Sequence, residues 1–243
     1  MMRHNGLVWS ACVIALGLAV AGWFVGHGFL EGRMSDRFVT VKGVSERDVM
    51  ADIALWPIRF VSTDNDLGRA QARIDEGKNA VLAFLRKHGI QESQVEVQAL
   101  EVNDILANPY RSGPTDSRFI ITQTLIVRSG APELIRTASQ KVNELVEAGV
   151  VLSSSGGPAG GPTYLFTRLN DLKPAMIAEA TANARAAAEQ FASDSGSRLG
   201  RIRRANQGVF VILARDRAQG IMAESQLNKT VRVVSTIEYY LKD

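Results

Sequence analysis

The hydrophobic pattern begins with one long uninterrupted run. Residues 7–30, LVWSACVIALGLAVAGWFVGHGFL, include no side chain that is charged at neutral pH. A helix rises about 1.5 Å per residue, so this run is long enough to cross a hydrocarbon core of roughly 30 Å. The pattern therefore predicts a transmembrane anchor or signal-anchor over residues 7–30, with a short tail at residues 1–6.

Behind this run, apolar and polar residues alternate. Residues 39–44 predict a short strand, residues 45–48 a polar turn, and residues 49–62 a longer strand that completes a hairpin. Pro57 cannot donate to a ladder, so it predicts an edge or a bulge, and we interpret Trp56-Pro57 as strand geometry and not as a binding feature. The faces of the second strand should carry Ile53 and Leu55 on one side and Trp56, Ile58 and Phe60 on the other.

Helical periodicity follows in two segments. Asp64 and Asn65 are expected to cap the first helix, which Gly89 closes. The second is predicted over residues 132–147, with Gly149 at its end. The inward stripes should be Leu67, Ala70, Ile74, Val81 and Leu85 in the first helix and Ile135, Ala138, Val142 and Leu145 in the second.

A third helix is rich in alanine. Asp171 is expected to cap it and Pro174 to lie in its first turn. So many alanines leave a slender face that lets a sheet approach closely. The predicted inward stripe is Ile177, Ala180, Ala184, Ala188 and Phe191.

The remaining alternating segments complete a repeat. Strands are predicted at residues 94–105, 118–128, 164–169, 199–213 and 230–241. Helix, strand and strand then recur in the same order, each set preceded by a strand. The fold class is therefore α+β, with two β-α-β-β units whose helices pack on mainly antiparallel sheets. We expect subunits at about 38–150 and 163–243, joined by a Gly/Pro/Ser-rich connection at 153–163.

Charge and cysteine content bear on location and partners. The net charge is +3, and the densest basic run, RIRR at residues 201–204, is interpreted as a solvated strand face, so nucleic-acid binding is not expected. Arg3 is the only charged side chain before Glu31, which favours a cytoplasmic N-terminus and export of residues 31–243. Cys12 is the only cysteine, so no intramolecular disulfide is possible. Cleavage after Ala21 is the alternative to an anchor.

One set of residues carries a family resemblance. The stretch RFVTVKGVSERDVMADIALWPIRF, directly behind an apolar N-terminal segment, resembles the SIMPL domain (DUF541) family in its membrane-anchored bacterial branch. Ala184-Arg185 and the entry GSRLGRI at residues 196–202 are similar to its Ala-rich helix and the strand after it. The matching residues of the first stretch are Val39, Val41, Gly43, Glu46, Ala51, Asp52, Ala54 and Trp56.

The resemblance implies a location and a role. Proteins of this family are mostly periplasmic or envelope-associated; some are linked to oxidative-stress tolerance and some form large homo-oligomers. The family supplies no agreed catalytic residues to carry over. We therefore expect a single-pass inner-membrane protein with its C-terminal domain in the periplasm, or a soluble periplasmic protein if the N-terminal segment is cleaved.

Candidate chemistry is sparse. His88 is the only histidine beyond the apolar run, and a favourable contact with the helix dipole accounts for it. Asp64 and Asp66 lack a calcium-loop pattern and fit helix capping better. We interpret Asp75-Glu76, and Glu144 with Glu147, as solvated helical faces. The sequence predicts no catalytic, cofactor-binding or metal-binding residues and no cofactor.

The expectation is therefore a non-enzymatic envelope protein that self-assembles into a homo-oligomer and contacts the membrane through residues 7–30. A different class of protein, a periplasmic binding module for a small ligand or an envelope component, is the alternative. A carboxylate-based hydrolase is the third and least favoured interpretation, because two carboxylates that are distant in sequence can meet in space.

Overall fold

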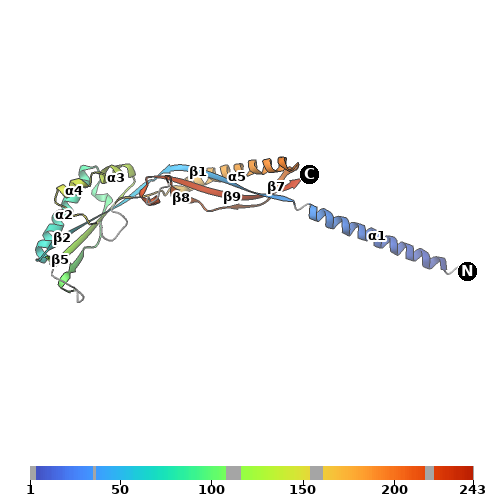
Figure 1. Cartoon of the computed structure of the whole chain (residues 1–243), viewed down its shortest axis with the longest axis horizontal. Coiled ribbons are helices and arrows are strands. Elements are labelled where there is room, and N and C mark those ends of the chain that lie inside the picture. Colours follow the sequence, from blue (N-terminus) through green and yellow to red (C-terminus); the bar gives the residue numbers. More distant parts are fainter. Residues whose placement is uncertain (1–3, 35–36, 108–115, 154–160, 217–221, 243) are drawn as a thin grey trace. The chain divides into compact units, whose positions relative to one another are not determined.

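The computed structural model describes residues 4–34, 37–107, 116–153, 161–216 and 222–242 (Figure 1). The helices are α1 (His4–Met34), α2 (Leu67–Lys87), α3 (Pro132–Ser139), α4 (Asn143–Glu147) and α5 (Leu169–Asp194). The strands are β1 (Phe38–Met50), β2 (Ile53–Asp64), β3 (Val95–Val97), β4 (Glu101–Asp104), β5 (Phe119–Ser129), β6 (Thr163–Leu165), β7 (Arg198–Gln207), β8 (Val211–Ala214) and β9 (Asn228–Lys242). Short 3-10 turns are η1 (Glu92–Gln94), η2 (Ile105–Ala107) and η3 (Ala223–Ser225).

The strands form two sheets. Sheet A has the order β1-β9-β7, and β8 also pairs with β9. Sheet B has the order β3-β5-β2-β6, and β4 also pairs with β5. Strand β5 runs antiparallel to β2, β3 and β4, and β9 runs antiparallel to β7 and β8. The predicted α+β class with antiparallel sheets is confirmed.

The N-terminal segment forms one helix, as predicted. Helix α1 is 31 residues long, and the apolar side chains described along it, among them Trp9 and Phe24, are exposed. Among the helices in the described part of the chain, none has the length and apolarity that a membrane crossing requires. The helix is thus confirmed, whereas the predicted transmembrane span has no support from this finding.

The hairpin predicted at the start of the domain is wrong. Strand β1 continues through residues 45–48, where the sequence predicts a turn, and it belongs to sheet A, whereas β2 belongs to sheet B. Ser45 is buried and its hydroxyl donates to Glu179 Oε2 at 2.9 Å, so its side chain serves packing and not a turn. Glu46 and Arg232 then form an ion pair at 3.2 Å. Paired polar residues let the strand continue where unpaired ones favour a turn.

The chain divides into two compact units that are interleaved in sequence. Unit 1 consists of Met1–Ser45, Pro174–Phe210 and Val233–Asp243, and unit 2 of Glu46–Lys173 and Val211–Arg232. This division differs from the predicted contiguous subunits, 38–150 and 163–243. The predicted connection ends at Thr163, the first residue of β6, which pairs with β2 in sheet B; residues 154–160 lie outside the described residues.

The predicted repeat holds in a modified form. Each repeat ends with a long strand, which is β5 after α2 and β9 after α5. In sheet B, β5 lies between β2 and β3, and in sheet A, β9 lies between β1 and β7. The strand that begins the second unit is therefore β1, from the N-terminal part of the chain, and not the segment at 164–169 that the sequence predicts. That segment contributes only the three-residue β6 to sheet B.

The core of unit 2 lies between sheet B and α2. Ala54, Trp56, Ile58 and Phe60 are buried on one face of β2, as predicted, because alternate residues of a strand point to the same side. On α2 the predicted stripe is confirmed for Ala70, Ile74, Val81 and Leu85, with Phe84 added, whereas Leu67 is exposed. The cap is Asp66, whose carboxylate accepts from Arg69 N, and not Asp64 or Asn65.

On the side of β2 away from β5, β6 pairs with residues 53–55 and Leu152 bridges Phe60, so among the described residues no strand pairs with Pro57 on that side. Ser153 N donates to Arg59 O and Val61 N donates to Val151 O, so odd-numbered residues of β2 direct their backbone groups away from β5. The missing N–H of Pro57 therefore costs no bond to β5, and the register with Ile126 is continuous. The β2–β5 register has no bulge, and β2 is an edge only locally, around Pro57, because β6 pairs with the first residues of β2.

Helix α5 covers sheet A through a narrow alanine stripe. Its buried residues repeat every four positions: Met176, Ala180, Ala184, Ala188 and Ala192. The predicted close approach is confirmed, because a Cβ placed on Gly43 of β1 would lie 1.8 Å from Ala180 O. The expected stripe is wrong at its ends, where Ile177 is only half-buried and Phe191 is exposed. The helix begins at Leu169, so Asp171 and Pro174 lie inside it.

Several predicted elements are shorter than expected. The helix predicted over 132–147 is two helices, α3 and α4, with Ile135, Ala138 and Leu145 buried and Val142 half-buried. The strands predicted at 94–105 and 199–213 are each divided in two. Gly89 and Gly149 follow the ends of α2 and α4 at φ +80° and +83°, a conformation that glycine adopts without strain.

Candidate functional site

Asp52 of the family-like stretch ties two segments of unit 2 together. Its Oδ1 accepts from Thr167 N at 2.9 Å, and its Oδ2 accepts from Thr167 Oγ1 at 3.0 Å and from Arg168 N at 3.1 Å. Arg168 Nε lies 3.4 Å from the same oxygen. Asp52 thus satisfies backbone donors immediately before α5 and positions this segment of the chain.

Asp64 links the end of β2 to the start of α2. The side chain is almost fully buried, and its Oδ1 accepts from Arg69 Nη2 at 2.8 Å and from Asp66 N at 3.0 Å, while Arg73 lies 3.2 Å from Oδ2. The hydrogen bonds from Arg69 and the Asp66 backbone lower the pKa of Asp64 to about 2. Both carboxylate oxygens therefore have cationic or backbone partners within unit 2.

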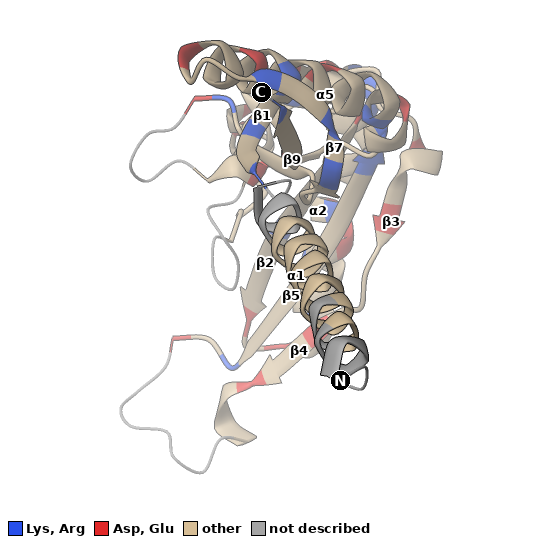
Figure 2. Ribbon diagram, turned by 90° about the vertical axis from the view of Figure 1, so that its right-hand side faces the viewer, with Lys and Arg blue, Asp and Glu red and all other residues tan. Residues whose placement is uncertain are grey.

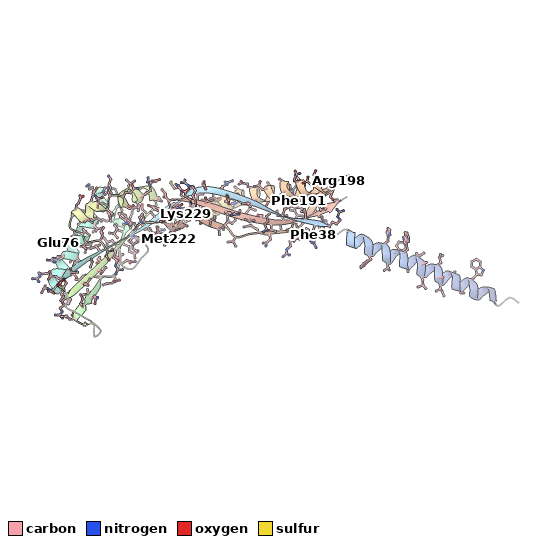
Figure 3. All side chains as sticks on the ribbon, viewed as in Figure 1. Phe38, Glu76, Phe191, Arg198, Met222 and Lys229 are labelled. Atoms are coloured by element: carbon pink, nitrogen blue, oxygen red, sulfur yellow. The ribbon has the colours of Figure 1, made fainter. Side chains whose placement is uncertain are left out.

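A cavity of about 400 Å³ opens between β2, α2 and the segment after α4. Its walls include Phe60 and Ile74, and its polar groups include Thr63, Arg73 and Glu76. Arg73 Nη1 donates to Thr63 O at 3.1 Å, so this cation is held at the rim. Glu76, labelled on α2 in Figure 3, is exposed. The volume falls in the range of small-molecule sites, and the lining places one cation and one carboxylate at it.

His88 ends α2 and forms a small cluster with α4. His88 Nε2 lies 3.2 Å from Glu144 Oε2, and Lys87 Nζ donates to the same oxygen at 2.9 Å. The ring of His88 also packs on Phe84 with 4.6 Å between centroids. The hydrogen bond from Lys87 is the main cause that lowers the pKa of Glu144. The cluster joins α2 to α4. None of its residues lines the cavity between β2, α2 and the segment after α4.

Within the described ranges, no group of three or more acidic, histidine or cysteine side chains could hold a metal ion. Glu144 and Glu147, which the sequence presents as a pair, are both on α4, and Glu147 Oε1 accepts from Asn143 at 3.3 Å. Of the carboxylates singled out in the sequence, Glu76 lines the cavity between β2, α2 and the segment after α4.

Sheet B carries an exposed apolar edge. Strands β3 and β4 both pair with β5, and no further strand of the described chain pairs with them. We define the apolar edge as Val97, Leu100, Val102 and Leu106, which are 54%, 38%, 50% and 52% exposed. Two carboxylates beside it are neutralised, Glu101 by Arg59 at 2.8 Å and Asp104 by Arg118 at 2.9 Å. The apolar edge therefore presents apolar side chains without unpaired charge at these two positions.

These observations define an α+β protein whose candidate features are one open cavity and exposed strand edges. The SIMPL family, described as "Protein of unknown function (DUF541)", matches residues 39–239. This range is most of the chain, so the chain belongs to the SIMPL family. A search of curated proteins found no match.

The cavity and the apolar edge were not predicted from the sequence. Thr63 and Glu76 belong to different elements, and the walls at residues 148–151 come from a third segment. Only the tertiary fold brings them together. The apolar edge had a signal, since Val97, Leu100 and Val102 do not keep the alternation of one strand; this break marks the division into β3 and β4.

Proposed function

We propose that this protein is a non-enzymatic envelope protein that self-assembles into a homo-oligomer while its N-terminal helix attaches it to a membrane. The observation that carries the assembly is the apolar edge along β3, β4 and η2. An exposed strand edge with apolar side chains is a template for pairing with another chain. A second copy supplies the same edge, and two edges can pair about a two-fold axis.

The attachment rests on the sequence of α1. A cytoplasmic N-terminus and an exported domain are supported by two features. The run from Leu7 to Leu30 is uncharged, and Arg3 precedes it. Because no described helix satisfies the requirements for a span, the attachment needs its own test. Cells that express the full chain are fractionated, and the membranes are washed at high salt and then at alkaline pH.

Retention of the chain in the alkali-washed pellet supports the anchor. Release into a soluble exported fraction supports cleavage after Ala21, and recovery of an uncleaved chain in the cytosol contradicts the proposed location. A reporter at the C-terminus that is active only outside the cytoplasm establishes the side of the membrane.

The assembly is tested with Val102→Lys together with Leu106→Lys in the full chain. Both side chains are about half exposed, so the fold should tolerate the change, while two added cations repel across a symmetric edge. Sedimentation velocity in a mild detergent should show an oligomer for the natural sequence and a monomer for the variant. Val146→Lys, at a 59% exposed position on α4, is the matched control and should leave the oligomer intact.

A natural chain that remains monomeric at high concentration contradicts the proposed assembly. An oligomer that survives both lysines places the contact on another surface and contradicts the role of the apolar edge. A link to envelope or oxidative stress tolerance, which the family resemblance implies, is tested separately by the survival of cells that lack the protein under peroxide.

A second candidate function follows from the cavity in unit 2. Arg73 and Glu76 place opposite charges at a volume of about 400 Å³, which favours a small zwitterionic ligand such as a free amino acid. A thermal-shift screen of amino acids should raise the melting temperature if one binds. Glu76→Gln should abolish the shift while leaving the melting temperature of the free protein unchanged.

A further inference from the structure

Strand β7 is unusually basic. Four of its ten residues are arginine, all of them exposed: Arg198, Arg201, Arg203 and Arg204. Two further exposed cations, Arg37 and Lys42, lie just before and within β1, and Lys242 lies near the end of β9. Across the described unit 1 residues of these three strands, Glu238 is the single carboxylate. Figure 2 shows blue segments along β7.

Backbone pairing gathers these cations at one end of sheet A. Leu241 N donates to Arg37 O at 2.9 Å, Arg37 Nη2 donates to Ser197 Oγ at 3.2 Å, and Arg198 lies opposite Lys242 in the register. Phe38 and Arg198 lie at the same end of the sheet in Figure 3. We call the set Arg37, Arg198, Arg201, Arg203, Arg204 and Lys242 the basic end.

Aromatic rings lie among these charges. The guanidinium carbon of Arg203 lies 4.0 Å from the ring centroid of Phe38 and 6.0 Å from that of Tyr240. Arg203 also lies 3.6 Å from Glu238, whose charge offsets only one of the six cations. Phe38 remains 42% exposed. An arginine stacked on aromatic rings keeps its charge while an apolar ring is presented beside it, as at a membrane–water interface.

Helix α5 leaves this side of the sheet open. Val41, Gly43 and Ser45 of β1 are buried towards α5, so Phe38, Thr40 and Lys42 point to the opposite face. Glu238 and Tyr240 alternate with the buried Ile237 and Tyr239 of β9 and share that opposite face. The aromatic rings and Arg203 therefore lie on a face that no described helix covers.

The sequence holds the basic end close to the apolar helix. Six residues separate Leu30 from Arg37, and a chain of that length spans at most about 25 Å. A domain attached through α1 therefore keeps the basic end within reach of the lipid headgroups. Clustered arginines next to a membrane segment attract anionic lipids with about 1 kcal/mol for each charge.

We propose that the basic end of sheet A binds the anionic headgroups of the membrane to which α1 attaches, so that the domain lies against the bilayer. This inference rests on the proposed membrane attachment. The recognised chemistry is a phosphodiester headgroup with net negative charge, such as that of phosphatidylglycerol. Guanidinium groups form paired hydrogen bonds with phosphate oxygens, and Phe38 contacts the apolar boundary below them.

The test uses the full chain with Thr40→Cys in a Cys12→Ser background, labelled with a fluorophore on the open face of β1. The protein is added to vesicles of phosphatidylcholine with or without phosphatidylglycerol, both containing a lipid that carries a nitroxide quencher on its headgroup. Quenching is expected with phosphatidylglycerol, at most weakly without it, and should disappear as salt is raised. Equal quenching in both vesicles, or none in either, overturns the inference.

The decisive variant is Arg201→Gln with Arg203→Gln and Arg204→Gln. At about fivefold for each charge, the docking equilibrium should weaken roughly a hundredfold. The control is Arg86→Gln with Arg128→Gln and Arg136→Gln, three exposed arginines of unit 2 with the same loss of charge. Quenching that persists in the first variant, or is lost equally in both, overturns the inference.

Flotation of the same samples distinguishes headgroup binding by the basic end from membrane attachment through α1. A chain that floats and resists alkaline washing, yet shows no headgroup quenching, keeps the anchor and overturns the role of the basic end. A chain that floats only with phosphatidylglycerol and is released by salt supports the basic end and contradicts the anchor. A chain that never floats contradicts both.

Discussion

Asp64 lies at the junction between β2 and α2, where one carboxylate joins two elements. It accepts hydrogen bonds from Arg69 and from the backbone of Asp66, and Arg73 lies within ion-pair distance. Asp66 caps the helix, which leaves Asp64 to hold two cations of the first turns. Asp66 therefore caps α2 and Asp64 binds the two arginines, so each acid at the start of α2 has its own role.

Asp64→Asn should lower the melting temperature at pH 7 by a few degrees, because the amide cannot hold both arginines. The folded-state pKa of about 2 lies below the ordinary value of 3.8, so the stabilisation is present above about pH 4 and is lost as the pH falls towards 2. Thermal unfolding measured from pH 7 to pH 2 should show the two proteins converging. A constant difference across this range contradicts the assignment.

Lys229 on β9 is a buried amine. The residue is 4% exposed, and its Nζ donates to Ala223 O in the η3 turn. Desolvation lowers the pKa of this lysine, and the neighbouring charge of Glu224 offsets part of that effect. Its position is labelled in Figure 3. The amine thus contributes a hydrogen bond at the cost of taking a charge out of water.

Lys229→Met should raise the melting temperature at pH 7 by a few degrees, since it keeps the length of the side chain and removes the buried charge. Because the folded-state pKa is lowered, the unfolded chain binds more protons between that value and 10.5, and the stability of the natural protein rises with pH in this window. The advantage of the variant should therefore shrink towards pH 10 in urea unfolding. A variant that is less stable at both pH values contradicts the prediction.

At the scale of the element, the contact between β1 and α5 depends on the smallest side chains. On α5 the contact is made by Ala180 and Ala184, and Gly43 of β1 lies directly against their backbone. A four-residue spacing keeps the stripe on one side of the helix. The exposed Phe191 lies off this stripe, which is why the apolar helix pattern and the buried stripe differ at the C-terminal end.

Gly43→Ala should be severely destabilising, by about 4 kcal/mol or more, because the new Cβ would lie 1.8 Å from Ala180 O and 2.5 Å from Ala184 N. Both atoms belong to a helix backbone that cannot move without displacing α5. Gly130→Ala is the control, since the nearest atom to its Cβ would be 4.0 Å away. Urea unfolding should show a large loss for the first variant and almost none for the second.

At the scale of the whole molecule, the chain passes between its two units several times. Strand β1 begins in unit 1 and ends in unit 2, and β9 does the reverse. Sheet A therefore needs residues from both ends of the chain. Pairing of strands so distant in sequence loses chain entropy on loop closure. The contacts that offset this loss form only when both ends of the chain are present.

A fragment of residues 163–243 should therefore fail to fold, although it is one of the two subunits that the sequence predicts. It lacks β1, so the edge of β9 and the alanine stripe of α5 are left without their partner. Circular dichroism and amide-proton dispersion should show a largely unfolded fragment. The full domain, residues 37–243, is the control and should fold; a cooperatively folded fragment contradicts the interleaved arrangement.

Local alternation along the chain predicts some features of this fold, and features built from distant segments escape it. The face of β2 that carries Trp56, Ile58 and Phe60 was predicted, because alternation fixes which side chains share a side. The continuation of β1 through residues 45–48 was not predicted, since polar residues occur both in turns and in paired strands. The cavity at Arg73 and Glu76 was invisible, as its walls come from three segments.

The sequence by itself determined part of the local structure: the segments that form α1, α2 and α5, the apolar face of β2, the glycine that follows the end of α2, and why α5 is thin. These properties depend on neighbours within a few residues along the chain. Only the tertiary structure decided which strands pair, that β1 and not residues 164–169 completes sheet A, and that the cations of β7 gather beside Arg37 and Phe38. The physical reason is that pairing between distant strands depends on competition among partners that look alike locally, and packing and closure of the whole chain settle that competition.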